Sequence, residues 1–160
     1  MPAALATFLT WTTYGTWLQG DARGSIVRVS AGRTRAIIPS PALERSNRAS
    51  LKHEPTRLDR RQRTAVESAI RRVCEHRDWT LHAINVRSNH VHLVATLTKD
   101  ADAAMVDLKA WSTRRLRADG LIASDRRVWT KHGSTRQIHN AASLAAAVDY
   151  VVRFQDRPRR

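Results

Sequence analysis

The stretch Asn89-His90-Val91-His92-Leu93-Val94-Ala95 constrains the fold more than any other part of the chain. It is a short apolar run, which we expect to form a strand. Side chains in a strand alternate between two faces, so His90 and His92 share one face and the apolar residues between them point to the other. Two imidazoles on neighbouring same-face positions can bind one metal ion. The alternative is a pair of half-buried histidines packed in a sheet.

Apolar spacing in the rest of the chain predicts an alternation of strands and helices. Strands are expected at residues 5–13, 79–86, 90–97 and 127–129, and helices at 57–77, at 101–118 and from Asn140 or Ser143 toward Phe154. The two middle strands are separated by a short turn and should form an antiparallel hairpin. This order predicts an α+β fold of the ferredoxin-like type, an antiparallel sheet with helices packed on one face.

The charge of the chain indicates a polyanionic partner. The 160 residues include 28 Lys and Arg against 14 Asp and Glu, a net charge of +14, and the excess is spread along the chain. Nucleic acid is therefore the expected partner, and an anionic membrane surface is the weaker alternative. No apolar run is long enough to span a bilayer and the N-terminus lacks a signal-peptide pattern, so we expect a cytoplasmic protein associated with the nucleoid.

The length suits a single domain over residues 1–160. Residues from about 21 to 55 lack sustained periodicity and contain several prolines, serines and arginines. We expect this stretch to be an irregular basic insertion, either a binding loop over DNA or a disordered segment.

The last predicted helix contains one tyrosine, Tyr150, among small and apolar residues. At about 100° per residue, Tyr150 lies more than a quarter turn from the stripe of Leu144, Val148 and Val151. A phenol has a reference pKa of ~10 and is a poor nucleophile at neutral pH without help from a cation or a base. A metal on the histidine pair could supply that help, whereas the alternative is a tyrosine packed edge-on with its hydroxyl in water.

The pattern His90-Val91-His92 after Asn89, together with one tyrosine on a C-terminal helix, resembles the HUH superfamily of single-tyrosine transposases. Residues 12–18, 108–109 and 129–134 are similar to its insertion-sequence and REP-associated branches. The resemblance implies metal-dependent cleavage and rejoining of single-stranded DNA at hairpin-containing element ends, through a 5′-phosphotyrosine intermediate and a free 3′-hydroxyl. It implies that Tyr150 is the nucleophile and that His90 and His92 bind Mg²⁺ or Mn²⁺.

One family feature is displaced in this sequence. The family takes a third metal ligand from a polar residue one helical turn after the tyrosine, where this chain has Phe154, and Gln155 comes one position later. On a regular α-helix Gln155 would be ~140° from Tyr150, so it can serve only if the helix end is distorted. The alternatives for this ligand are Asp156 and water.

Contacts to DNA are expected from two basic regions and a turn. Phosphates would be neutralised by arginines of the insertion, by the basic face of the second helix and by a lysine near Gly133. These candidates are Arg23, Arg33, Arg35, Lys109, Arg114, Arg115 and Lys131, with Trp17, Trp111 or Trp129 stacking on unpaired bases.

Three other functions are compatible with parts of the sequence. A DNA- or RNA-binding protein derived from a transposase would have the same fold with weak or lost chemistry. An RNA-binding ferredoxin-like module would carry aromatic residues where His90 and His92 stand. A histidine-triad hydrolase would need a third alternate histidine, but position 94 is Val94. The resemblance leaves a monomer and a homodimer open, because in some relatives the tyrosine helix serves the partner's histidines.

Overall fold

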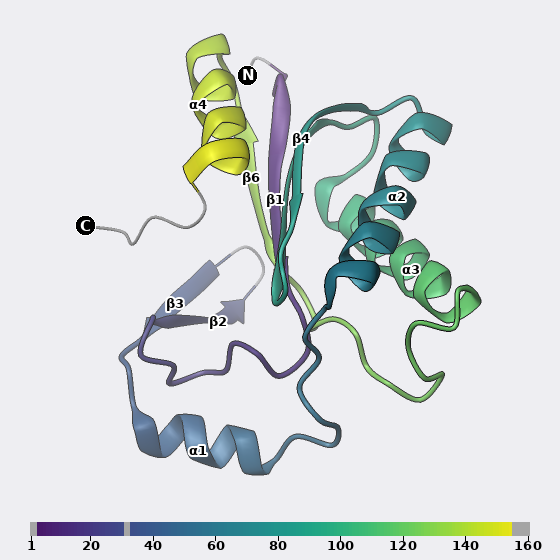
Figure 1. Cartoon of the computed structure of the whole chain (residues 1–160). Coiled ribbons are helices and arrows are strands. Elements are labelled where there is room, and N and C mark those ends of the chain that lie inside the picture. The colour runs from purple at the N-terminus through teal and green to yellow at the C-terminus, as the bar shows by residue number, and fades with distance from the viewer. Residues whose placement is uncertain (1–2, 31–32, 155–160) are drawn as a thin grey trace.

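The computed structural model describes residues 3–30 and 33–154. Its centre is a four-stranded sheet in the order β4-β5-β1-β6, in which every neighbouring pair is antiparallel (Figure 1). The strands are β1 (Ala6–Thr12), β4 (Thr80–Val86), β5 (His90–Thr96) and β6 (Ser134–Ile138). The predicted ferredoxin-like α+β class is confirmed, including the hairpin that joins β4 to β5.

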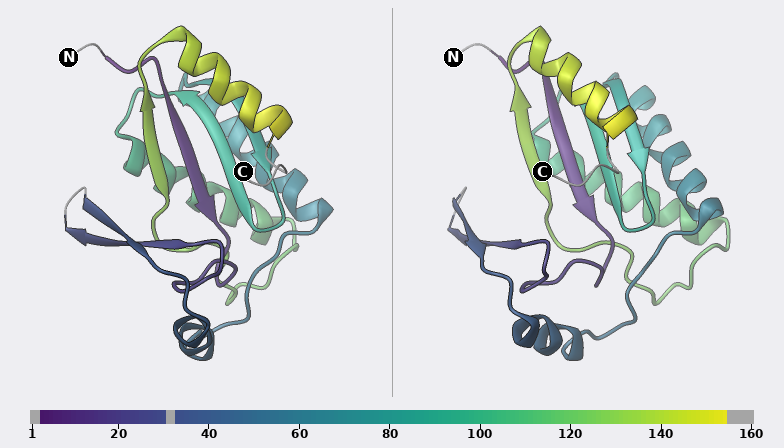
Figure 2. Two further views of the ribbon diagram at one scale, coloured as in Figure 1. Left: turned by 90° about the vertical axis from the view of Figure 1, so that its left-hand side faces the viewer. Right: turned by 60° about the vertical axis from the view of Figure 1, so that its left-hand side comes forward.

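Helices cover both faces of this sheet. α2 (Arg60–His76) and α3 (Ala101–Ala118) pack on one face, as expected, whereas α4 (Ala141–Asp149) crosses the other face (Figures 1 and 2). The prediction that all helices lie on one face was therefore wrong for α4. α4 lies on this face because a second, smaller apolar cluster is buried there. α4 contributes the buried Ala147 to it, and the next turn contributes Val151.

The main core forms where the apolar face of the sheet packs against the apolar stripes of α2 and α3. Val91, Leu93 and Ala95 are fully buried on the α2–α3 face of β5, and Leu9 and Trp11 of β1 join them. α2 begins after a capping box formed by Asp59 and Gln62, and it buries a continuous stripe that includes Val66, Ile70 and Cys74. None of the helices in the described part of the chain combines the length and apolar character needed to cross a bilayer.

The fourth strand lies later in the sequence than predicted. Trp129 makes only an isolated bridge with Thr13, and its ring packs edge-on against Trp11 at 6.1 Å. The strand that completes the sheet begins at Ser134. Because β6 is an edge strand with four exposed residues out of five, it lacks the apolar alternation that marks a strand in a sequence.

The stretch predicted to be an irregular insertion contains regular structure. β2 (Ser25–Ser30) and β3 (Arg33–Ile37) form a separate two-stranded antiparallel sheet, and α1 (Pro41–Ala49) follows, away from the main sheet (Figure 2). α1 has no buried residue, and all but one residue of β3 are exposed. β3 therefore gave no apolar alternation, whereas the start of α1 carried a signal that was missed, because Ser40 caps the helix and Pro41 occupies its first turn.

Candidate active site

The candidate site lies on the α4 face of β5. The pleat places His90 and His92 on this face, where both rings are half-buried and their centroids are 4.7 Å apart. His92 lies in register with Thr10 of β1 on one side and with Asn85 of β4 on the other. The prediction that the two imidazoles project side by side is confirmed.

Tyr150 reaches the same place from the end of α4. Its ring centroid is 5.7 Å from that of His92, and the two rings meet edge to face at 73°. Phe8 of β1 contacts both, with centroids 5.4 Å from His92 and 6.1 Å from Tyr150. Two imidazoles and a phenol from distant parts of the sequence therefore converge on one side of the sheet within a single chain.

Each histidine has a polar neighbour on its Nδ1 atom. The side-chain oxygen of Asn89 lies 2.7 Å from Nδ1 of His90, and the hydroxyl of Thr10 lies 2.8 Å from Nδ1 of His92. Such contacts fix the orientation and tautomer of metal-binding histidines. Because both contacts are made at Nδ1, a cation would be held through Nε2 of each ring.

The backbone changes its helical repeat at Tyr150. Residues Tyr150–Phe154 form a π-helical turn, in which hydrogen bonds span five residues instead of four. Asn85 of β4 donates from its side-chain nitrogen to the carbonyl of Val151 at 3.2 Å, which ties this turn to the sheet next to His92. Single π-turns within α-helices occur frequently at functional sites.

The donor set partly fits a divalent cation. Two oriented imidazoles are suitable ligands for Mn²⁺, and less so for Mg²⁺, which prefers oxygen. In the described ranges, no third histidine, cysteine or carboxylate completes a metal-binding group with them. Gln155 and Asp156, the candidates for the next ligand, lie outside the described residues. The remaining ligands would be water, DNA oxygens or these residues.

Comparison with known protein families identifies the family of this chain. The family model described as "Transposase IS200 like" matches residues 49–153, about two thirds of the chain. The chain belongs to the IS200-like transposase family. The matched region contains His90, His92 and Tyr150, whereas β1, with Thr10 and Phe8, precedes it.

A solved structure has the same fold as this transposase family member. It is a REP-associated tyrosine transposase bound to a REP hairpin, with a TM-score of 0.54 and 16% sequence identity. The alignment covers 94% of this chain, which spans only 66% of the length of that transposase. No curated protein sequence matches the chain.

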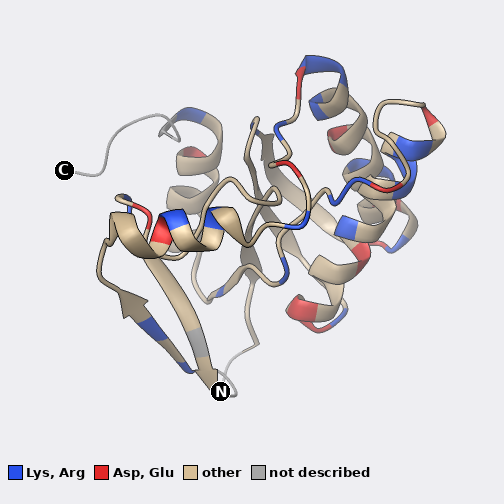
Figure 3. Cartoon of the chain, turned by 90° about the horizontal axis from the view of Figure 1, so that it is seen from below, with Lys and Arg blue, Asp and Glu red and all other residues tan. Residues whose placement is uncertain are grey.

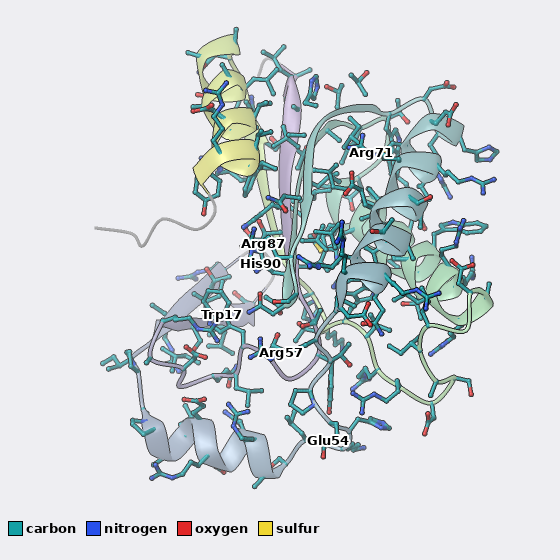
Figure 4. All side chains as sticks on the ribbon, viewed as in Figure 1. Trp17, Glu54, Arg57, Arg71, Arg87 and His90 are labelled. Atoms are coloured by element: carbon teal, nitrogen blue, oxygen red, sulfur yellow. The ribbon has the colours of Figure 1, made fainter. Side chains whose placement is uncertain are left out.

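Two arginines that were not predicted from the sequence lie next to the candidate site. Arg136 of β6 is in register with Phe8, and its guanidinium carbon lies 5.4 Å from the Phe8 ring centroid. Arg87 lies beside His90 at the β4–β5 turn, where its backbone nitrogen donates to the carbonyl of His90 at 2.8 Å (Figure 4). The alternation of side chains along β6 could have placed Arg136 on this face of the sheet, but only if the strand had been predicted at Ser134–Ile138.

Two of the predicted DNA-binding cations are engaged within the protein. Arg23 donates to the carboxylate of Asp21 and to the carbonyl of Thr16, and it stacks over Trp17 at 4.3 Å. Lys109 donates from Nζ to the carbonyls of Thr130 at 2.9 Å and His132 at 2.5 Å. Desolvation lowers the pKa of Lys109 to about 8. In this conformation both side chains hold loops together, although the Arg23 side chain is still half exposed.

The other predicted cations lie on the surface. Arg33 and Arg35 are exposed on β3, and Lys131 is exposed on the turn before β6. Arg114 and Arg115 lie on α3, on the opposite side of the sheet from Tyr150. Lys and Arg are visible on α1 and over the α2–α3 layer in Figure 3. Candidate DNA contacts are therefore distributed over several surfaces.

Proposed function

We propose that this chain cleaves and rejoins single-stranded DNA at hairpin-containing ends, with Tyr150 as the nucleophile. The observation that carries the proposal is the 5.7 Å separation between the rings of Tyr150 and His92, with His90 adjacent. At this separation one phosphodiester can contact the phenol and a cation held by the histidines. Membership in the IS200-like transposase family and the fold shared with a hairpin-bound REP transposase support it.

In the proposed reaction the Tyr150 oxygen attacks the scissile phosphorus in line with the departing 3′ oxygen. A bond forms between the phenol oxygen and phosphorus, and the bond to the 3′ oxygen breaks. The phenol loses its proton and the released 3′ oxygen gains one. Attack on the phosphotyrosine by another 3′-hydroxyl reverses these changes and restores Tyr150, so no nucleotide cofactor is consumed.

His90 and His92 would hold the metal, oriented by Asn89 and Thr10. When bound, Mg²⁺ or Mn²⁺ supplies Lewis-acid polarisation of the phosphodiester. Phe8 packs against both His92 and Tyr150 and would hold their rings at a fixed spacing. Arg136 and Arg87, on either side of this group, would neutralise phosphates next to the cleaved bond.

The π-turn supports Gln155 as the third ligand. An α-helical repeat aligns Tyr150 with position 154, whereas hydrogen bonds that span five residues favour alignment with position 155. Gln155 could act as a ligand only if the helix end were distorted, and the π-turn directly before Gln155 is such a distortion. The role of Gln155 itself remains part of the proposal.

Trapping a covalent adduct tests this function. We expect single-stranded hairpin DNA labelled 3′ of the cleavage site to become attached to the protein in the presence of Mn²⁺, and the Tyr150→Phe variant to give no adduct. The matched control is Tyr14→Phe, which changes the chain's other tyrosine, a buried residue whose hydroxyl accepts from the backbone of Lys52. An adduct that survives Tyr150→Phe would assign the nucleophile elsewhere. DNA binding without any adduct would favour a transposase-derived binding protein.

A further inference from the structure

A basic groove with an exposed tryptophan runs between α2 and α3. Its volume is about 490 Å³, and it lies in the helical layer on the opposite side of the sheet from Tyr150. Five basic residues and one aromatic residue on its walls carry the argument: Arg72, His76 and Arg77 from α2 and its C-terminal end, and Trp111, Arg114 and Arg115 from α3. We propose that this groove binds an unpaired nucleotide of the DNA, remote from the bond that Tyr150 cleaves.

Trp111 is placed for stacking and is not part of the core. Its side chain is 46% exposed, although the same helix buries Ala104, Met105, Leu108 and Leu116. The guanidinium carbon of Arg114 lies 4.8 Å from the indole centroid. An exposed indole beside an arginine provides a platform for base stacking and cation–π contact.

The charge on the groove is only partly neutralised. Arg77 pairs with Asp107 at 3.2 Å, and Arg115 pairs with Asp119 at 2.7 Å. Across residues 3–30 and 33–154, no carboxylate lies within ion-pair distance of Arg72 or Arg114, although the charge of Arg114 helps to lower the pKa of Asp107. These two guanidinium groups, one on each wall, therefore suit the phosphates on either side of a bound base.

The size of the groove selects an unpaired base over a duplex. Its volume falls within the range of small-ligand pockets, ~300–1,000 Å³, which suits one flat base but not a double helix. A second groove, of about 590 Å³, shares Arg115 and continues toward Arg60 and Arg61 at the start of α2. The DNA backbone on one side of the stacked nucleotide could therefore follow a line of basic side chains across the helices.

Binding of a short oligodeoxythymidine, measured by fluorescence anisotropy without divalent metal, tests the proposal. It rests on the proposed function only for the choice of DNA as the ligand, and the measurement uses the Tyr150→Phe protein so that cleavage plays no part. We expect Trp111→Ala to weaken binding about tenfold and Trp111→Tyr to retain most of it. Arg72→Gln and Arg114→Gln should each reduce the slope of log affinity against log salt by about 0.7.

The matched control is Arg71→Gln, next to Arg72 in the sequence. Arg71 pairs with Glu67 at 2.8 Å and does not line the groove, so the same loss of charge should have a smaller effect there. A second measurement uses the same oligonucleotide carrying 5-iododeoxyuridine, which should cross-link to Trp111 on irradiation.

Three results would overturn the proposal. The first is an unchanged affinity in Trp111→Ala, Arg72→Gln and Arg114→Gln, with cross-links that map elsewhere. The second is an equal loss for duplex and single-stranded DNA in Trp111→Ala, which would exclude base stacking. The third is equal effects of Arg71→Gln and Arg72→Gln, which would indicate a general loss of charge. If the wild-type protein forms no covalent adduct but the groove variants behave as expected, the cleavage proposal fails and this one stands.

Discussion

The ring of Tyr150 contacts the ring of His92 in the same chain, with centroids 5.7 Å apart. The contact is possible because β6, at the edge of the sheet beside β1, leads into α4, which then crosses the sheet toward β5 and β4 (Figure 2). The candidate nucleophile and the candidate metal-binding pair are therefore assembled in cis. A second copy of the chain is not needed to bring them together.

Assembly in cis predicts that two inactive variants cannot complement each other. His92→Ala and Tyr150→Phe should each fail to form the DNA adduct, and an equimolar mixture should also fail, because neither chain contains both groups. Gel analysis of the adduct measures this outcome. Wild-type protein mixed with Tyr150→Phe should form adduct in proportion to the wild-type fraction. Recovery of adduct in the mixture of variants would mean that the tyrosine segment exchanges between copies.

The hydroxyl of Thr10 should tune metal binding at His92. Thr10→Val removes the contact to Nδ1 of His92 with little change in shape. We expect the Mn²⁺ concentration for half-maximal adduct formation to rise by about 10–100-fold, the usual effect of losing such a partner. Thr135→Val, the same change at an exposed position of β6, is the control. Equal Mn²⁺ dependence in both variants would show that Thr10 does not orient His92.

Lys109 should stabilise the turn that leads into β6. Lys109→Met leaves the carbonyls of Thr130 and His132 without their donor, so we expect the free energy of unfolding to fall by about 1–3 kcal/mol in urea titrations. Lys131→Met, on the same turn but exposed, should change stability by less than about 0.5 kcal/mol.

The Lys109 effect should grow with pH. Desolvation lowers the pKa of Lys109 to about 8 in the folded protein, below the ~10.4 of an unfolded lysine. Between these values the unfolded chain binds the proton more tightly, so the wild type gains stability as pH rises through this window. The difference between wild type and Lys109→Met should therefore be larger near pH 9.5 than near pH 7. A difference that is constant with pH would contradict the lowered pKa.

Asp21 should stabilise the loop before β2 at neutral pH. Its buried carboxylate accepts hydrogen bonds from the side chain and the backbone nitrogen of Arg23, and the side-chain bond is the main reason that the pKa of Asp21 is lowered. Because Arg23 is half exposed, we expect Asp21→Asn to cost about 1 kcal/mol at pH 7, measured by urea unfolding.

A carboxylate with a lowered pKa contributes its stability above its unfolded pKa, near 3.8, and loses it as pH falls through the folded value. The difference in free energy of unfolding between wild type and Asp21→Asn should therefore shrink as the pH falls into the acid range. Glu67→Gln, which removes the exposed pair with Arg71, should have little effect at either pH. A gap that persists in acid would point to packing and not to charge.

Strong burial made most of the fold predictable. The predicted strand at 79–86 and helix at 101–118 differ from β4 and α3 by at most one residue, because α3 buries one clear stripe and β4 packs Leu81, Ile84 and Val86 against the main core. β3 and β6 were missed or misplaced because they bury little, so hydrophobic spacing gave no signal, and α1 was missed although Ser40 and Pro41 mark its start. The sequence pattern also did not predict which face of the sheet α4 covers, because the small residues of α4 can pack on either face.

The sequence by itself determined which chemical groups are available. Alternation along β5 put His90 and His92 on one face, whereas Tyr150, which helical spacing separated from Leu144, Val148 and Val151, packs against the same apolar cluster as they do. Only the tertiary structure decided that the phenol and the imidazoles meet, that Thr10 contacts His92, and that Lys109 holds the turn before β6. These relationships join residues that strand pairing, the path of α4 and the packing of α3 bring together across up to about 80 positions of chain. Local periodicity reports which side chains share a face of one element, but it contains no information about which other element covers that face.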